Sequence, residues 1–431
     1  MKNNHFLTRR DFLQKAAAVG AAMSIPSIVP STVFGANAPS NRITMGMVGM
    51  GGQMGGHLRG MLSRNDVQVL AVCDVHQGRL MQAKQNVEST YGGNTASGTY
   101  KGCDAYNEYE TLCRRPDIDS VFICTPDHWH TMICLEAMKN GKDVFCQKPL
   151  TLTIREGQLL RNAAKQYGAI FQVGSQQRSE WAFRTACEMV RNGWIGEIKT
   201  IYTQLGRFSP PKTLPEQPIP EGFDYDRWLG PTPWYPYNAE RVLGNFGGGW
   251  RCFWEYGSRK NGDWGAHHFD IIQWALGMDN SGPVRFVPKG WEGTEYQTHY
   301  YKNGISVLRD HPVTGGQMIE FVGTEGQVMV SRNGRLETVP SDLKDRPMGP
   351  NDIRLYESDN HDGNWIDCMK TRQETICTAE IGHRTATICH LSGIAERLGR
   401  PIEWDPDEEK ILNDSEASRW FDRPRRAPYV L

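Results

Sequence analysis

The sequence predicts an α/β protein of two domains, with a parallel sheet in the first and an antiparallel sheet in the second. Its 431 residues exceed what one hydrophobic core usually organises. Over the first third, apolar runs of strand length alternate with helical patterns, which is typical of a parallel sheet. In the second half, alternating runs such as residues 198–204 and 318–322 are typical of half-exposed antiparallel strands.

Residues 1–38 resemble a twin-arginine export signal. Arg9 and Arg10 precede an alanine-rich apolar stretch that a glycine and a proline interrupt. A helix of the roughly 20 residues needed to span a bilayer is therefore not expected. We expect a cleaved signal, a periplasmic protein and no membrane span in the mature chain. The alternative is an arginine pair on a surface helix.

Charge and cysteine content bear on the classes of partner. The 48 basic and 49 acidic residues give a formal charge of -1, so no general attraction to nucleic acid is expected. The 11 cysteines form no Cys-x-x-Cys pair, which indicates neither a metal knuckle nor a disulfide framework. We interpret the cysteines in apolar runs as small buried hydrophobic residues.

A glycine-rich turn follows the first apolar run, residues 42–48, and leads into a helical pattern. At such a turn, backbone N–H groups and the positive end of a helix can approach a pyrophosphate. The third small position of G-x-G-x-x-G falls on Met54, and Gly55 comes one residue late, so we expect a loop lengthened by one residue. The predicted cofactor-binding residues of this turn are Gly49, Gly51, Gly52, Gln53 and Met54.

A second strand, residues 67–73, ends in Asp74, where an acidic residue can accept hydrogen bonds from the adenosine ribose. A carboxylate there repels a 2′-phosphate, so NAD is preferred, while His76 and Arg79 leave NADP open. A glycine motif alone is as often a tight turn as a cofactor loop. The flanking strands and Asp74 favour the dinucleotide-binding Rossmann fold.

The strand at residues 120–126 ends in a proline and precedes a helix expected at 131–140. Ligands of open parallel sheets bind outside the carboxyl ends of the strands. We therefore expect four residues to face the dinucleotide, namely Thr125, Pro126, His128 and His130. The two histidines could be a metal pair, but we favour packing beside the cofactor or a helix start.

The chain after Arg42 resembles the Gfo/Idh/MocA family, which includes glucose-fructose oxidoreductase and inositol dehydrogenase. The resemblance rests on the order and spacing of four stretches, residues 49–55, 125–130, 147–149 and 262–270. It implies a Rossmann domain and an α/β domain whose open, mostly antiparallel sheet forms one wall of the substrate cleft. We expect these domains at 41–165 and 166–405, and a surface tail at 406–431. Because this sheet often forms the subunit interface in the family, a homodimer or homotetramer is expected.

The family's Glu-Lys-Pro motif appears here as Gln147-Lys148-Pro149. The resemblance implies that Lys148 lies between nicotinamide and substrate, where its ammonium can stabilise charge on the reacting oxygen. Gln147 departs from the motif, because it lacks the acidic group that could influence the charge state of Lys148. Without the resemblance, a lysine before a proline is more often a solvent-exposed turn residue.

The family's Asp-x-Gly-x-His motif matches Asp263 and His267, which are four residues apart and so expected on one helix face. The resemblance implies that His267 is the general acid/base, and imidazole has the pKa for that role. Asp263 would hold substrate hydroxyls or orient the imidazole. His268 and Asp270 are expected to pack or cap, and a metal site of His-His-x-x-Asp type is not favoured.

An aromatic, proline-rich stretch from Phe208 to Trp264 also carries several arginines. Flat rings can stack on the C–H face of a sugar, although most single rings in such a stretch belong to a core or an interface. We expect the stretch as a whole to line the substrate cleft. The predicted substrate-binding residues are Lys148, Arg178, Trp250, Asp263 and His267.

Together these features predict an NAD(P)-dependent oxidoreductase that transfers hydride between nicotinamide and a hydroxyl or carbonyl carbon of a sugar. Because export limits the supply of free cofactor, we expect the dinucleotide to be tightly bound. One alternative is an NAD-dependent glycoside hydrolase, which oxidises its substrate transiently and cleaves it by elimination. Another is a carbohydrate-binding protein without enzymatic activity.

Overall fold

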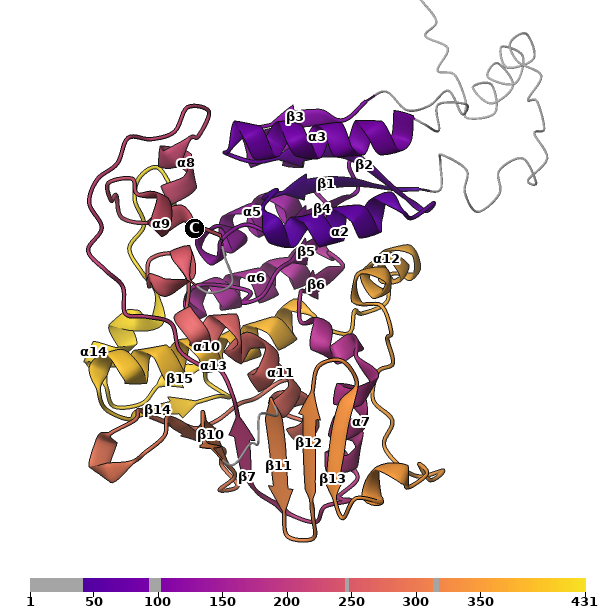
Figure 1. The fold of residues 1–431 in the computed structure, drawn as a ribbon, viewed down its shortest axis with the longest axis vertical. Coiled ribbons are helices and arrows are strands. Elements are labelled where there is room, and N and C mark those ends of the chain that lie inside the picture. Colours follow the sequence, from indigo (N-terminus) through magenta and orange to yellow (C-terminus); the bar gives the residue numbers. More distant parts are fainter. Residues whose placement is uncertain (1–41, 93–101, 245–247, 313–317) are drawn as a thin grey trace, which may run out of the picture. The chain divides into compact units, whose positions relative to one another are not determined.

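The computed structural model describes residues 42–92, 102–244, 248–312 and 318–431 (Figure 1). Ile43–Leu431 form one compact unit. The expected export signal at 1–38 lies outside the described residues. Within these ranges, no helix has the length and apolar character needed to cross a bilayer.

The N-terminal domain is built on a six-stranded sheet of order β3-β2-β1-β4-β5-β6, in which every pair is parallel. The strands are β1 (Ile43–Val48), β2 (Val67–Cys73), β3 (Asp104–Tyr106), β4 (Ser120–Ile123), β5 (Asp143–Cys146) and β6 (Phe171–Val173). The strand order reverses beside β1, which is where such sheets bind ligands. Because β6 completes this sheet, the domain extends past the boundary predicted at residue 165.

Five helices connect these strands and cover the parallel sheet (Figure 1). They are α2 (Gly52–Leu62), α3 (Gln77–Gly92), α4 (Tyr109–Cys113), α5 (Asp127–Lys139) and α6 (Ile154–Tyr167). The start of α6 is fixed by a capping box between Thr153 and Glu156, and it ends at Gly168 in the left-handed region. Helix α5 begins four residues before the expected start, directly after Pro126.

The C-terminal domain contains a nine-stranded sheet of order β13-β12-β11-β7-β10-β9-β8-β14-β15. The strands are β7 (Ile198–Thr203), β8 (Arg285–Val287), β9 (Thr298–Tyr300), β10 (Ser306–Arg309), β11 (Ile319–Gly323), β12 (Gln327–Ser331), β13 (Arg335–Val339), β14 (Ile402–Asp405) and β15 (Lys410–Ile411). Only the β7–β10 pair is parallel among the described strands of this sheet, which confirms the predicted mostly antiparallel sheet. Since β15 belongs to this sheet, the domain continues past residue 405.

The helices of the second domain lie on the side of its sheet that faces the first domain or alongside β12 and β13 (Figure 1). They include α7 (Trp181–Arg191), α10 (Arg259–Asp263), α11 (Gly265–Leu276), α12 (His361–Thr371) and α13 (Ala379–Leu398); short helices α8 (Tyr225–Leu229), α9 (Ala239–Val242) and α14 (Ser415–Ser418) lie in the connecting segments. Helix α13 packs on both α6 and α11, so one apolar core continues from the first domain into the second.

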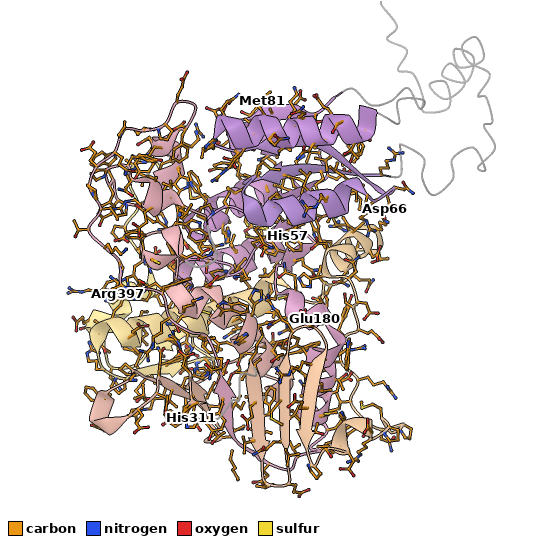
Figure 2. The ribbon with its side chains drawn as sticks, viewed as in Figure 1. His57, Asp66, Met81, Glu180, His311 and Arg397 are labelled. Carbon is orange, nitrogen blue, oxygen red and sulfur yellow. The ribbon has the colours of Figure 1, made fainter. Side chains whose placement is uncertain are left out.

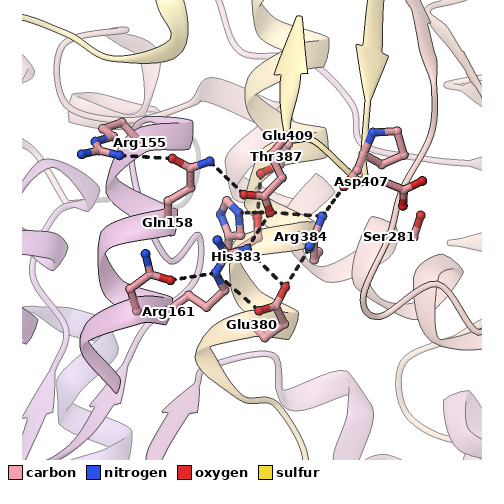
Figure 3. A network of polar contacts seen from close by, with 12 residues as sticks. Arg155, Gln158, Arg161, Ser281, Glu380, His383, Arg384, Thr387, Asp407 and Glu409 are labelled. Carbon is pink, nitrogen blue, oxygen red and sulfur yellow. Dashed lines mark hydrogen bonds and ion pairs between the residues drawn. The ribbon is translucent and has the colours of Figure 1, made fainter. Parts of the chain in front are cut away.

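A buried polar network joins α6, α13 and the turn before β15 (Figure 3). The carboxylate of Glu409 lies 3.0 Å from Nε2 of His383 and accepts hydrogen bonds from Arg161 at 2.6 Å and Gln158 at 2.8 Å. Arg384 lies 3.1 Å from the same carboxylate. The segment around His383, for which the sequence left cleft contact or capping open, therefore connects the two domains.

Candidate functional site

The glycine turn after β1 has the geometry of a phosphate cradle. Gly49 has a φ of +86°, and a Cβ there would lie 2.8 Å from backbone atoms of Cys124 and Thr125, so a side chain is excluded. A Cβ at Gly51 or Gly52 would meet nothing within 4 Å. Helix α2 begins directly at Gly52 and has no side-chain cap, which leaves its first N–H groups available to an anion.

These glycines form one end of a cleft, called here the cofactor cleft. Of the predicted residues, it is lined by Gly49, Gly51, Gly52, Gln53, Asp74, Thr125, Pro126, Lys148 and Trp250. The cleft lies at the carboxyl ends of β1, β2, β4 and β5, as expected for a parallel sheet. An open helix start, a carboxylate and a lysine along one cleft fit the pyrophosphate, ribose and nicotinamide of a dinucleotide.

The side chain of Met54 does not face the cofactor cleft, so only its backbone N–H, one of the first in α2, could contact a cofactor. Its side chain is fully buried in the apolar core between α2 and the sheet, together with Leu58. The expected lengthening of the loop is also absent at this point, because α2 starts immediately after Gly51. Met54 thus occupies the position where the motif usually has a small residue, and its side chain packs inward.

Asp74 stands at the end of β2 with both carboxylate oxygens engaged. One accepts from the backbone N–H of Met50 at 2.7 Å and the other from that of His76 at 2.8 Å. Burial raises the pKa of Asp74, while the His76 N–H and the charge of Arg79 oppose this shift. Each oxygen keeps a further lone pair that can accept from a ribose hydroxyl. Arg79 lines the same cleft, so the preference for NAD over NADP stays a prediction.

His128 and His130 are corrected as residues facing the cofactor, because neither lines the cofactor cleft. Nε2 of His128 lies 2.8 Å from the carbonyl oxygen of Trp228. Nδ1 of His130 lies 2.9 Å from the carbonyl of Pro149, and its Nε2 lies 3.0 Å from that of Thr125. Burial lowers the pKa of each imidazole to about 4. Because a neutral imidazole has a single N–H, His130 can donate to only one of these two carbonyls at a time, and it packs between the loops that carry Thr125 and Lys148.

Lys148 follows β5 and meets the second domain at Asp263. Its Nζ donates to the backbone carbonyl of Asp263 at 2.8 Å and contacts the carboxylate at 3.3 Å. Burial lowers the pKa of Lys148, and the negative charge of Asp263 opposes that shift. The structure thus brings these two predicted catalytic residues together from different domains at the wall of the cleft.

The expectation that Asp263 and His267 share one regular helix is wrong. Helix α10 ends at Asp263 and α11 begins at Gly265. The backbone N–H of His267 bonds to the carbonyl of Trp264 at 3.0 Å instead of reaching back to Asp263. The carbonyl of Asp263 is therefore free to accept the hydrogen bond from Lys148. The carbonyl oxygen of Asp263 thus links the helix break to the position of Lys148.

His267 is buried beside this break, and it is not among the residues that line the cavities described here. Its Nδ1 has no hydrogen-bond partner among the described residues. Burial lowers its pKa well below the ordinary range, and the charge of Lys148 lowers it further. The imidazole is therefore neutral and can accept a proton, but a pKa lowered this far makes it a weak base in this state. The role of His267 stays a prediction.

Arg178, predicted to bind substrate, instead lies in the interior of the protein. Its side chain is 1% exposed and makes a bidentate pair with Asp270 at 2.8 and 2.9 Å. It also donates to Asp279 at 2.7 and 3.1 Å and stacks over Trp274 at 5.0 Å. Its guanidinium thus already donates four hydrogen bonds to carboxylates inside the protein. His268, by contrast, contacts Thr203 at 3.2 Å in the interior, where packing was expected.

Sequence reasoning missed three charged residues near Lys148. Asp127 lines both the cofactor cleft and a smaller adjoining cavity, called here the inner cavity, with Lys148, Trp250 and Asp263. Burial raises the pKa of Asp127 to about 7 against the opposing charges of Arg251 and Lys148. Its position directly after Pro126 could have indicated a site residue, because a carboxylate there lies in the first turn of a helix at the carboxyl end of a strand.

Arg251 and Lys260 gave no such signal, since they lie in an irregular aromatic segment. Their nitrogens lie 3.5 and 3.3 Å from the carboxylate of Asp263. Burial would raise the pKa of Asp263, but the cations Lys148, Arg251 and Lys260 together lower it below its usual value. Asp263 therefore stays ionised in a buried site that holds more positive than negative charge.

The Gln147 side chain is neutral and is tied to the second domain. His57 lies in α2 (Figure 2). The amide Nε2 of Gln147 lies 2.8 Å from Nε2 of His57, and Nδ1 of His57 lies 2.6 Å from the carboxylate of Asp362 in α12. In the tautomer with a proton on Nδ1, His57 donates to the carboxylate of Asp362 and accepts the amide N–H of Gln147 at Nε2. A glutamate at 147 would face the Nε2 lone pair instead. Among the described residues, no cluster of three or more His, Cys, Asp or Glu could hold a metal ion.

Known families match both domains. Residues 43–175 match a family described as "Oxidoreductase family, NAD-binding Rossmann fold", and residues 199–431 match one described as "Oxidoreductase family, C-terminal alpha/beta domain". These are the two halves of the Gfo/Idh/MocA family. The expected NAD(P)-binding Rossmann domain is thereby confirmed, and its matched end lies beyond the predicted 165.

Similar proteins include an uncharacterized oxidoreductase, YrbE, of Bacillus subtilis, which is 23% identical over 86% of this chain and 99% of its own length. A glycosyl hydrolase family 109 protein of Shewanella is 31% identical, over 35% of this chain and 36% of that protein. A crystal structure of aldose-aldose oxidoreductase from Caulobacter crescentus has the same fold, with a TM-score of 0.57 at 16% identity; the match covers 84% of this chain and 99% of that chain.

Proposed function

This chain belongs to the Gfo/Idh/MocA oxidoreductase family, and on that premise we propose that it transfers hydride between tightly held NAD and a hydroxyl or carbonyl carbon of a sugar. The observation that carries the proposal is the contact of Lys148 with Asp263 at the wall of a cleft that begins at the glycine turn. It supports the proposal because Lys148 lines the cofactor cleft and Asp263 lines the inner cavity that adjoins it.

The chain's own groups divide the work. The N–H groups at the start of α2 bind the pyrophosphate and Asp74 binds the ribose. When bound, the dinucleotide supplies the nicotinamide ring that accepts or gives hydride. Lys148 stabilises negative charge on the reacting oxygen, and Asp263, held ionised by its three cations, orients substrate hydroxyls. The neutral imidazole of His267 accepts the hydroxyl proton.

Replacing Lys148 tests this assignment. Lys148→Met is expected to lower kcat by about 10²–10³ in an assay that follows NADH at 340 nm, because a preorganised charge on the oxygen is lost. Lys148→Arg keeps a positive charge and should recover part of the rate, while Lys139→Met, at an exposed site in α5, is the control. Unchanged kcat in Lys148→Met would contradict the proposed role.

Cofactor retention is tested separately. The purified protein is denatured, and the released small molecules are identified by mass spectrometry. We expect about one NAD per chain. A protein that neither releases NAD or NADP nor takes it up on soaking would contradict the proposal. Loss of turnover in His267→Ala with sugar binding kept would speak against a protein that only binds carbohydrate.

The second candidate function is NAD-dependent glycoside cleavage, which the partial similarity to a glycosyl hydrolase family 109 protein favours. In that reaction a transient oxidation would acidify a neighbouring C–H, elimination would break the glycosidic bond, and hydride would return. Release of nitrophenol from p-nitrophenyl glycosides without net NADH distinguishes it. Net NADH with an unmodified sugar supports the dehydrogenase.

We also propose export to the periplasm and assembly as a homodimer or homotetramer through the nine-stranded sheet. Cell fractionation of the native chain and of an Arg9→Lys/Arg10→Lys variant tests export, since the variant should stay in the cytoplasm. Light scattering coupled to size-exclusion chromatography measures the assembly. A monomeric mass at micromolar concentration would contradict the assembly.

A further inference from the structure

A third cavity, of about 330 Å³, adjoins the inner cavity within the second domain. We call it the basic groove, and its charged walls carry Arg207, Arg259, Lys260, Lys289 and Arg309. Only two carboxylates, Asp310 and Glu396, line it as well. Five cations against two anions stand out in a chain whose formal net charge is -1.

Three of these cations are not neutralised by the protein. Among the described residues, no carboxylate lies within ion-pair distance of Arg207, Arg259 or Lys289, whereas Arg309 pairs with Asp310 at 3.1 Å. Arg259 donates to the carbonyls of residues 208 and 209, and its Nε is buried with no partner. Arg259 is half-buried, and a half-buried cation without a counter-ion is unfavourable, so an anionic ligand would relieve it. Arg207 and Lys289 are exposed, so they carry no such cost and add attraction for an anion at the mouth of the groove.

The basic groove begins at the reaction site. Arg259 lines both the inner cavity and the groove. Lys260 lies in the groove wall and also contacts Asp263 at 3.3 Å, and Asp263 contacts Lys148 at the same distance. Because Arg259 is a wall of both cavities, a saccharide whose reacting carbon lies at Lys148 would reach the groove along Arg259, beside the pair of Asp263 and Lys260. An aromatic ring, Tyr296, lines the groove and can contact a sugar face.

We propose that the basic groove selects acidic saccharides, so that the substrate carries a carboxylate or sulfate group on the sugar next to the reacting one. This inference rests on the proposed function, since it uses Lys148 as the position of the reacting carbon. Guanidinium groups match both anions through paired hydrogen bonds. A neutral sugar in the groove would leave Arg207, Arg259 and Lys289 without counter-ions.

The test measures binding by calorimetry on the NAD-loaded full chain, so that it does not depend on turnover. The probes are trimers of galacturonate and of glucuronate, a sulfated trisaccharide, and the methyl ester of the galacturonate trimer as the neutral match. At 20 mM salt we expect at least one acidic trimer to bind about tenfold or more tightly than the ester. The difference should shrink at 300 mM salt, because exposed charges are screened.

Two exposed cations allow a matched variant. Arg207→Gln/Lys289→Gln should lose about tenfold or more in affinity for the acidic trimer and keep its affinity for the ester, while Lys139→Gln should change neither. A carboxylate or sulfate preference among the probes identifies the anion. Equal binding of ester and acid, no binding of any acidic probe, or unchanged affinity in the double variant would overturn the inference.

Failure of the proposed function looks different. A chain without bound NAD or NADP that still selects acidic trimers would contradict hydride transfer and leave the groove assignment intact. A chain that retains NAD and oxidises neutral sugars as well as acidic ones would contradict the groove assignment alone.

Discussion

Replacing Arg178 by methionine removes a buried charge while roughly keeping its volume. Among the described residues, Asp270, which is fully buried, would keep only the hydroxyl of Thr385 at 3.2 Å as a partner, and Asp279 would lose both of its bonds to the guanidinium. Breaking a buried ion pair from one side costs about 3–5 kcal/mol. Since domains are stable by roughly 5–15 kcal/mol, Arg178→Met should lose a large part of its free energy of unfolding.

The assay is urea unfolding followed by fluorescence, with NAD retention and KM measured on the folded protein. The matched control is Arg184→Met, because Arg184 pairs with the exposed Glu357 at 2.7 Å. Such a surface pair contributes about 0–1 kcal/mol, so the control should unfold almost like the native chain. Adding Asp270→Asn to Arg178→Met should restore part of the loss, since the two residues act as a pair.

The opposite pattern would refute this reasoning. If Arg178→Met unfolds at the same urea concentration as the native chain and raises KM for the sugar tenfold, then Arg178 binds substrate, as the sequence first indicated. If Arg184→Met and Arg178→Met lose the same stability, burial of the pair does not matter.

Three further predictions follow from the titratable network and the glycine turn. Burial raises the pKa of Asp127 to about 7 in the folded chain, above its ordinary 3.8. The stability that comes from holding this proton is fully present below about pH 4 and is lost as pH rises through 7. Asp127→Asn should remove this pH dependence from unfolding midpoints measured at pH 5 and 8. Glu409 has a pKa lowered by His383 and Arg161 despite burial, so its stabilisation is fully present above about pH 4.5 and is lost as pH falls further, through the lowered folded pKa. Glu409→Gln should therefore lose about 3 kcal/mol at pH 7, nearly as much at pH 4, and much less at the lowest pH at which the native chain stays folded; a loss that does not shrink toward that pH would contradict the pairing. Gly49→Ala forces a side chain onto the backbone of Cys124 at a φ of +86°, which costs about 1–2 kcal/mol for the dihedral alone, so NAD content after purification should fall; full occupancy would contradict the cradle.

The sequence predicted those parts of the molecule that local patterns specify. The strand before Gly49, the strand before Asp74 and the strand before Lys148 all end at the same edge of a parallel sheet, because parallel strands must share that edge. Their side chains therefore meet in one cleft. The mostly antiparallel second sheet followed in the same way from alternating residues.

Contacts between distant segments could not be read from such patterns. Arg178 is satisfied by Asp270 and Asp279, about a hundred residues away, and nothing in a local pattern distinguishes a guanidinium paired in the interior from one that waits for a substrate. His128 and His130 follow β4, which does end at the cofactor cleft. Their position on the first turn of α5, however, decides whether each imidazole faces the cleft or a backbone carbonyl behind it, and here both face carbonyls.

The break between α10 and α11 shows why spacing alone misplaces catalytic groups. Asp263 and His267 are four positions apart, and in a regular helix the carbonyl of Asp263 would accept the N–H of His267. Here that carbonyl receives the ammonium of Lys148, while His267 bonds to Trp264. The hydrogen bond lost from the helix is replaced by one across the two domains, so the cost of the break is offset by the contact that positions the lysine. A function that depends on the position of Lys148 therefore also depends on the missing helical hydrogen bond at the carbonyl of Asp263.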